Sequence, residues 1–231
     1  ARGLGYTVVD GATTMATHLS VILKNNANEL LGQDEAQQLL DRVAKSYPKL
    51  VTNLIPNKIQ LSTVTQILQN LLSEGIPVKD MRTITEALTI SKSEPSDADA
   101  LTAEVRPKLG RMIIQPLIDP AGKLTVITFA GDLERILESS HQKSDGAHVL
   151  LEPKLAESIL KALADNAHQI QEKGAVPVLV VSPNLRQWLA KFVKLRVPEL
   201  HVLAYTEIPE EQKIELFGSI GGDNAIEDGG R

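Results

Sequence analysis

The sequence contains no cysteine among its 231 residues. This absence excludes a disulfide framework, a thiolate zinc site, an iron–sulfur cluster and a cysteine nucleophile. Aromatic residues are few (three phenylalanines, three tyrosines and one tryptophan), so platforms that stack the bases of single-stranded nucleic acid are not expected. The net charge of −5 argues in the same direction, because phosphate-backbone binding needs a concentrated basic surface. No nucleic-acid partner is therefore expected.

Long apolar runs are also missing. The longest, residues 175–181, falls far short of the roughly 20 residues that span a bilayer, so no membrane contact is expected of this chain. The sequence begins at Ala1 without an initiator methionine, a basic segment or an apolar leader, which indicates a piece of a longer protein. With 42% hydrophobic and 23% charged residues, the composition is typical of a folded chain with one large or two small domains.

One short strand and one long helix are expected at the start of the chain. Residues 5–9 have the β-branched and aromatic content of a strand, and Asp10 can cap a helix over residues 12–31. Gly32 is placed to end this helix in a left-handed conformation. Because a lone strand leaves half of its backbone groups unpaired, its sheet is expected to come from a preceding region.

A helical region is predicted from residue 34 to residue 110. Gly75 should stop one helix, since glycine tolerates a positive φ, and the polar residues 91–97 read as a linker. Pro107 should kink the last helix of the region. The apolar residues that recur at helical spacing are Leu39, Leu40, Val43, Leu61, Val64, Ile67, Leu68, Leu71, Leu72, Met81, Ile84, Leu88, Leu101, Val105 and Leu109.

After residue 111 the period of the pattern changes. Residues 112–118 and 124–129 are expected to form a β-hairpin around a proline- and glycine-containing turn. The later strand–helix–strand spacing predicts a βαβ unit with a right-handed crossover. The remaining elements are predicted as helices at 131–141, 153–172 and from Pro183 behind a Ser182 cap, and as strands at 176–181, 200–205 and 213–220.

The predicted fold class is therefore mixed α/β (α+β), a mainly helical subdomain followed by a small α/β subdomain with a mixed sheet. Four segments follow from the changes of pattern. They are a strand–helix end of an incomplete first subdomain (1–32), the helical subdomain (33–110), the α/β subdomain (111–220) and a flexible tail (221–231).

No arrangement for catalysis or metal binding stands out. Ser182 follows an apolar strand but lacks the flanking glycines of a nucleophile elbow, and the carboxylates of Glu210 and Glu211 have no cause for a raised pKa. A basic strip of Lys191, Lys194 and Arg196 beside Trp188 is typical of a solvated helix face. No metal site is expected, because no two histidines stand at metal-binding helical spacing among His18, His141, His148, His168 and His201.

Residues 68–84, LQNLLSEGIPVKDMRTI, resemble the signature of the flagellar and injectisome export-gate family (FlhA/LcrD type, FHIPEP). A second block, residues 5–10 followed by 16–19, is similar to the strand-to-helix motif of that family in the same order. Shorter agreements stand at 54–56, 109–111 and 202–209, so the resemblance covers nearly the whole chain. Its details are closer to the flagellar branch than to the virulence branch.

The resemblance implies a polytopic protein of the bacterial inner membrane whose cytoplasmic part lies beneath the export gate. That part forms a nine-membered ring and receives chaperone–substrate complexes together with other export-apparatus proteins. It works without catalysis and without a cofactor. Within its four subdomains, this chain resembles the end of the first, the whole helical third and the α/β fourth.

The resemblance also implies candidate sites. The chaperone-docking groove of the family has one matching residue here, Thr17, which could equally be an ordinary half-buried helix position whose hydroxyl bonds back to a carbonyl. Pro77, Asp80 and Arg82 are candidates for a subunit interface in the ring, although a solvated first helical turn explains the two charged residues equally well.

Two other interpretations stay open. One is a small-molecule-binding or enzymatic cytosolic α/β domain, with a pocket beyond the strand ends at Val181 and Tyr205. The other is a purely structural ring segment that has no partner beyond further copies of itself.

Overall fold

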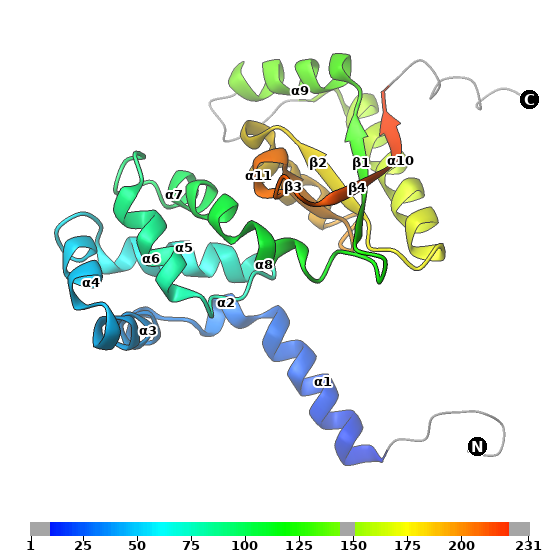
Figure 1. Ribbon diagram of the computed structural model, residues 1–231. Helices are drawn as coiled ribbons and strands as arrows, with labels where there is room; N and C mark the ends of the chain where they lie inside the picture. The colour runs from blue at the N-terminus through cyan, green and yellow to red at the C-terminus, as the bar shows by residue number, and fades with distance from the viewer. Residues whose placement is uncertain (1–9, 144–150, 222–231) are drawn as a thin grey trace, which may run out of the picture. The chain divides into compact units, whose positions relative to one another are not determined.

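The computed structural model describes residues 10–143 and 151–221, which belong to two compact units, Ala1–Lys108 and Leu109–Arg231 (Figure 1). The strand predicted at 5–9 and residues 222–231 of the predicted tail lie outside this described part. Each unit has its own buried apolar residues, so the two are described separately.

The first unit is helical over its described residues. Its core is built from residues on the predicted apolar stripes, such as Leu40, Ile67 and Leu101, which are fully buried. Capping carboxylates start three of its described helices, because Asp10 accepts from the N–H of Thr13, Asp80 from that of Thr83 and Asp97 from that of Ala100. The helices are α1 (Gly11–Asn25), α2 (Ala27–Leu30), α3 (Gln33–Ser46), α4 (Pro48–Leu54), α5 (Leu61–Ser73), α6 (Met81–Ile90) and α7 (Ala98–Val105).

The long helix predicted at 12–31 is interrupted, which corrects the expectation for Gly32. The Asn26 side chain donates from Nδ2 to the Ile22 carbonyl (2.8 Å), and α1 ends at this point. Gly32 has φ −98° and stands before α3, where its N–H donates to Glu35 Oε2 (2.9 Å). It therefore begins a helix in an extended conformation instead of ending one in the left-handed region.

Two other backbone predictions have different outcomes. Gly75 has φ +75° directly after α5, so the predicted glycine stop is confirmed. Pro107 does more than kink its helix, because α7 ends at Val105 and a 3₁₀ helix, η2 (Arg106–Leu109), replaces it. Proline has no N–H to donate to the preceding turn, and the tighter 3₁₀ winding accommodates this loss.

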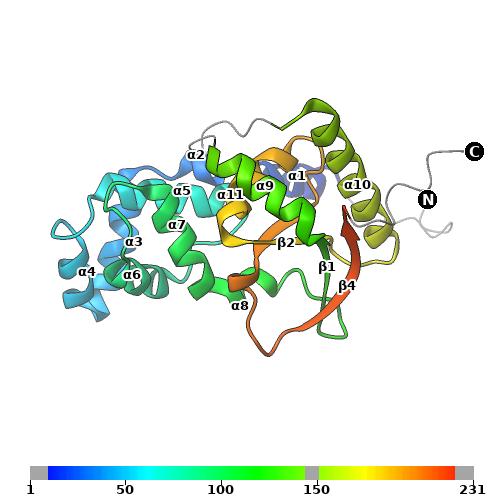
Figure 2. The same cartoon turned by 90° about the horizontal axis from the view of Figure 1, so that it is seen from above.

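The second unit contains a four-stranded sheet in the order β3-β2-β1-β4 (Figure 1). All pairings described are parallel, with Val126 opposite Val178 and Leu179 opposite Val202. Figure 2 shows β4 at the edge of the sheet beside β1. The elements are α8 (Gly110–Ile114), β1 (Lys123–Phe129), α9 (Gly131–Lys143), α10 (Pro153–Glu172), β2 (Val178–Val181), α11 (Pro183–Lys194), β3 (His201–Ala204), η3 (Tyr205–Glu207) and β4 (Lys213–Ile220).

The predicted β-hairpin at 112–118 and 124–129 is wrong. Residues 110–114 form α8, and only the second half of the hairpin is a strand. The buried residues Leu109, Ile113 and Leu117 recur every four positions, which is a helical period that a short apolar run does not distinguish from a strand. Without the hairpin, the described sheet is parallel instead of mixed, while the mixed α/β class and the βαβ unit are confirmed.

One core cluster holds the sheet to the helices α9, α10 and α11. The strands contribute alternate residues of one face, Ile127 and Phe129 from β1 and Leu179 and Val181 from β2. The helices contribute residues at helical spacing, all of them buried, namely Leu133, Leu137, Ile159, Leu163, Ala167, Ile170, Leu185, Leu189 and Val193. This packing leaves the outer strand β4 with exposed side chains at Ile214 and Leu216.

Candidate functional site

Thr17, predicted from the resemblance to take part in docking, lies near the middle of α1 and is exposed. Its hydroxyl donates to the Thr13 carbonyl (2.8 Å), which is the local hydrogen bond expected for a helical threonine. The exposed apolar residues Met15, Leu19 and Ile22 form a stripe on α1. At about 100° of rotation per residue, Thr17 lies on the side of the helix opposite this stripe.

Pro77, Asp80 and Arg82 lie in and after the turn that joins α5 to α6, and all three are exposed. The Asp80 carboxylate accepts from the N–H of Thr83 (3.1 Å) and from its hydroxyl (2.8 Å), so it caps α6. The Arg82 guanidinium donates from Nε to Glu86 Oε1 (2.8 Å). Both charges are therefore engaged within their own helix.

Arg82 also reaches across to the end of α3. It donates to the Tyr47 hydroxyl (3.0 Å), and its guanidinium carbon lies 4.6 Å from the centre of the Tyr47 ring. The two residues are 35 positions apart in the sequence. A cation over an aromatic face is attracted to it electrostatically, so this contact holds the end of α3 against the start of α6.

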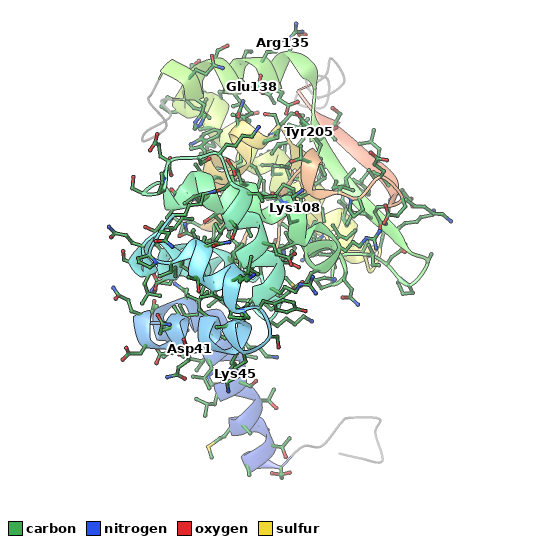
Figure 3. All side chains as sticks on the ribbon, turned by 60° about the vertical axis from the view of Figure 1, so that its left-hand side comes forward. Asp41, Lys45, Lys108, Arg135, Glu138 and Tyr205 are labelled. Atoms are coloured by element: carbon green, nitrogen blue, oxygen red, sulfur yellow. The ribbon has the colours of Figure 1, made fainter. Side chains whose placement is uncertain are left out.

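A groove of about 410 Å³ opens where these two segments meet. Val43 and Met81 are buried and supply apolar lining together with the half-buried Leu39, while Arg42 and Lys79 are exposed cations of the lining. Figure 3 marks the course of α3 by Asp41 and Lys45, which lie outside the lining. The structure therefore brings Asp80 and Arg82 together with three residues that sequence reasoning missed, Arg42, Tyr47 and Lys79.

The charges of this groove are mostly positive. Asp80 is its one acidic lining residue, and its carboxylate already accepts hydrogen bonds from the N–H and the hydroxyl of Thr83. Within the described part of the chain, the side chains of Arg42 and Lys79 form no hydrogen bond or ion pair. A mostly cationic lining over an apolar base can attract a carboxylate and bury an apolar side chain beside it.

The predicted Ser182 cap is corrected by the structure. Ser182 precedes α11, but its hydroxyl forms no capping bond, and Oγ is buried without a partner among the described residues. Its backbone N–H instead donates to Glu134 Oε1 of α9 (2.8 Å). A carboxylate of the chain thus lies at the start of α11, where a helix N-terminus would otherwise attract a ligand anion. This contact disfavours the small-molecule pocket considered beyond Val181.

In the basic strip, Lys191 and Lys194 of α11 and Arg196 just after it are exposed. Trp188 is half-buried and stacks on Phe192, with ring centres 5.3 Å apart.

Across the described ranges 10–143 and 151–221, no group of histidine, aspartate and glutamate side chains is arranged to hold a metal ion. Among the helices in those ranges, none has the length and apolar content needed to cross a membrane.

The FHIPEP family model matches residues 1–213, so the chain belongs to the FHIPEP family. Among curated relatives, the flagellar biosynthesis protein FlhA of Proteus mirabilis is 42% identical over 97% of this chain. FlhA of Escherichia coli K12 is 41% identical over 94%. The chain spans about a third of the length of these relatives, 32% and 31%.

Solved structures agree with this assignment. The cryo-EM structure of nonameric EPEC SctV-C superposes with a TM-score of 0.79 at 26% identity, covering 90% of this chain and 62% of that one. The nonameric cytosolic domain of EscV from the type III secretion system superposes with a TM-score of 0.71 at 27% identity, covering 85% and 58%. The resemblance predicted from residues 68–84 is confirmed, and the higher identity to FlhA supports the flagellar branch.

Proposed function

We propose that this chain is part of the cytoplasmic platform of a type III protein export apparatus in flagellum biogenesis. The observation that carries the proposal is its 42% identity to FlhA of Proteus mirabilis over 97% of the chain. The platform belongs at the cytoplasmic face of the bacterial inner membrane, as part of a polytopic protein. Its mechanism is reversible recognition, with no covalent chemistry and no cofactor.

The platform works as a ring that receives chaperones loaded with flagellar substrates and contacts other export-apparatus proteins. Support for self-association comes from SctV-C and the EscV cytosolic domain, both described as nonameric. The groove, Thr17 and the turn at Pro77 are exposed, so each is accessible for such contacts. Binding at any of these three places would involve no chemical reaction.

Breaker residues in the polar linker at 91–97 and near Gly110 are the two places where the helical and α/β subdomains would pivot, and the first is unsuitable. Residues 91–97 lie inside the first unit and are held by Glu104, which accepts from the N–H groups of Lys92 and Ser93 (both 3.1 Å) and from the Ser93 hydroxyl (2.6 Å). The side-chain hydrogen bond from Ser93 is the main reason that the pKa of Glu104 is lowered. The junction near Gly110 therefore remains the proposed pivot of the platform.

Thr17→Asp is expected to weaken the binding of a flagellar export chaperone loaded with its substrate by about tenfold, since it places a charge in the proposed contact. Isothermal calorimetry on the protein measures the effect. Thr52→Asp is the matched control, because Thr52 is also an exposed helical threonine bonded to a carbonyl four residues back. Equal binding by all three proteins would remove Thr17 from the docking site, and no binding by any would leave this chain as a structural ring segment.

Pro77→Arg is expected to abolish ring-sized species, because it adds a bulky charge to the proposed subunit contact without removing an internal hydrogen bond. Native mass spectrometry or sedimentation velocity reports the assembly. Pro95→Arg is the control, since Pro95 is an exposed proline in a loop of the same unit. If Pro77→Arg assembled like the unchanged protein, the subunit contact would lie elsewhere.

A further inference from the structure

We propose that the groove between α3 and α6 binds an acidic segment of another protein, which places carboxylates against Arg42 and Lys79 and an apolar side chain on Val43 and Met81. The groove lies entirely within the first unit of a single chain. Its formation therefore requires neither Thr17 nor a second copy of the chain.

The charge distribution favours an acidic partner. The protein as a whole carries a net charge of −5, yet this lining contains three cations and a single acid. Arg82 is bonded to Glu86, and Asp80 is bonded to Thr83. The side chains of Arg42 and Lys79 are left without an ionic partner among the residues that the structure describes. Carboxylates brought to them would complete pairs that the chain itself leaves open.

The apolar base favours a peptide segment over a small free anion. Val43 and Met81 are 9% and 6% exposed, and Leu39 is half-buried beside them. A volume of about 410 Å³ accommodates one or two side chains and lies within the usual range for binding pockets. A lone phosphate or carboxylate would use the cations and leave the apolar residues uncovered.

Tyr47, the aromatic residue of the groove lining, is held in position by Arg82 before any partner binds. Arg82 fixes the Tyr47 ring by a hydrogen bond and by stacking, and Tyr47 keeps 41% of its surface exposed. A partner that enters the groove therefore meets an aromatic face already in position, so less side-chain freedom is lost on binding. Arg82 and Tyr47 act as positioning residues, while Arg42 and Lys79 make the contact.

The test is fluorescence anisotropy on the intact protein with a short labelled peptide in which leucine is flanked by glutamates. We expect saturable binding that weakens as salt is raised, because the rim charges are screened. Arg42→Gln combined with Lys79→Gln is expected to weaken binding by about tenfold, the effect of two partly exposed ion pairs. Both residues are exposed, so the double variant keeps the fold.

Two controls make the outcome decisive. Lys92→Gln with Lys108→Gln removes the same charge from exposed positions outside the groove and should bind like the unchanged protein. The same peptide with glutamine in place of glutamate should not bind. Equal binding of both peptides, or equal loss in both double variants, overturns the proposal. If no peptide binds but self-association is lost in the Arg42 and Lys79 variant alone, the groove belongs to a second copy and the proposal is also overturned.

Discussion

Gly110→Ala is expected to lower the unfolding free energy of the second unit by about 3 kcal/mol. A Cβ atom at Gly110 would lie 2.2 Å from the carbonyl oxygen of Glu207 and 3.2 Å from its carbonyl carbon. These are backbone atoms of η3, so no rotamer change can relieve the clash. Chemical denaturation followed by circular dichroism measures the loss.

Gly131→Ala is the matched control for this experiment. Gly131 begins α9 in the same unit, and apart from its chain neighbours and the backbone of its own helix, no atom lies within 4 Å of its added Cβ. Alanine has the higher helix propensity, so the control should be neutral or slightly stabilising. If the two variants were equally stable, α8 could move away from Glu207 of η3 without a measurable loss of unfolding free energy, which would contradict the prediction.

Arg186→Met is expected to destabilise the second unit by about 3 kcal/mol. Arg186 of α11 and Glu207 of η3 are both 3% exposed, with Nε and Oε1 3.8 Å apart. Removing the guanidinium takes this opposite charge away from the buried Glu207 carboxylate, and deleting one partner of a buried ion pair is costly. The free energy of unfolding, measured in denaturant, reports the effect.

The double variant Arg186→Met with Glu207→Gln separates charge burial from packing. Because it removes both charges of this buried pair, it should be clearly more stable than Arg186→Met alone. If the single and double variants unfold at the same denaturant concentration, the loss comes from packing and not from the missing opposite charge. Both variants retain Gly110, so the result is independent of the first experiment.

Both predictions concern contacts of Glu207 in η3. Residues 109–111 and 202–209 were recognised as separate stretches of family resemblance, and the structure brings Gly110 against Glu207. A second contact joins Arg111 to Glu211, two residues beyond the second stretch (2.6 Å), but its side chains are 84% and 61% exposed. Exposed pairs contribute little, so the close approach of Gly110 to Glu207 is the contact between these segments that substitution should affect most.

Much of the secondary structure could be predicted from local patterns. The stop at Gly75 follows from its tolerance of positive φ, and the later strands and helices follow from periods of two and of 3.6 residues. The hairpin failed because residues 112–118 are too short an apolar run to distinguish a helix from a strand. The break at Asn26 was missed because a side-chain bond to the preceding turn decides it, and spacing does not show such a bond.

The candidate site divides in the same way. Asp80 and Arg82 could be identified because they lie in a recognisable segment, and the cap at Asp80 is a local interaction. Arg42, Tyr47 and Lys79 could not, because Tyr47 meets Arg82 across 35 positions. Cations on separate helices resemble ordinary solvated charges until packing places them around one groove.

The sequence by itself determined the family, the helical and α/β halves and the lack of thiol chemistry, since each depends on composition, local period or a contiguous motif. Only the tertiary structure decided the parallel sheet, the carboxylate of Glu134 at Ser182, the buried pair of Arg186 and Glu207, and the cationic groove. The physical reason is that each of these depends on atoms far apart in the chain, whose distances are set by the packing of helices and strands and not by their spacing in the sequence.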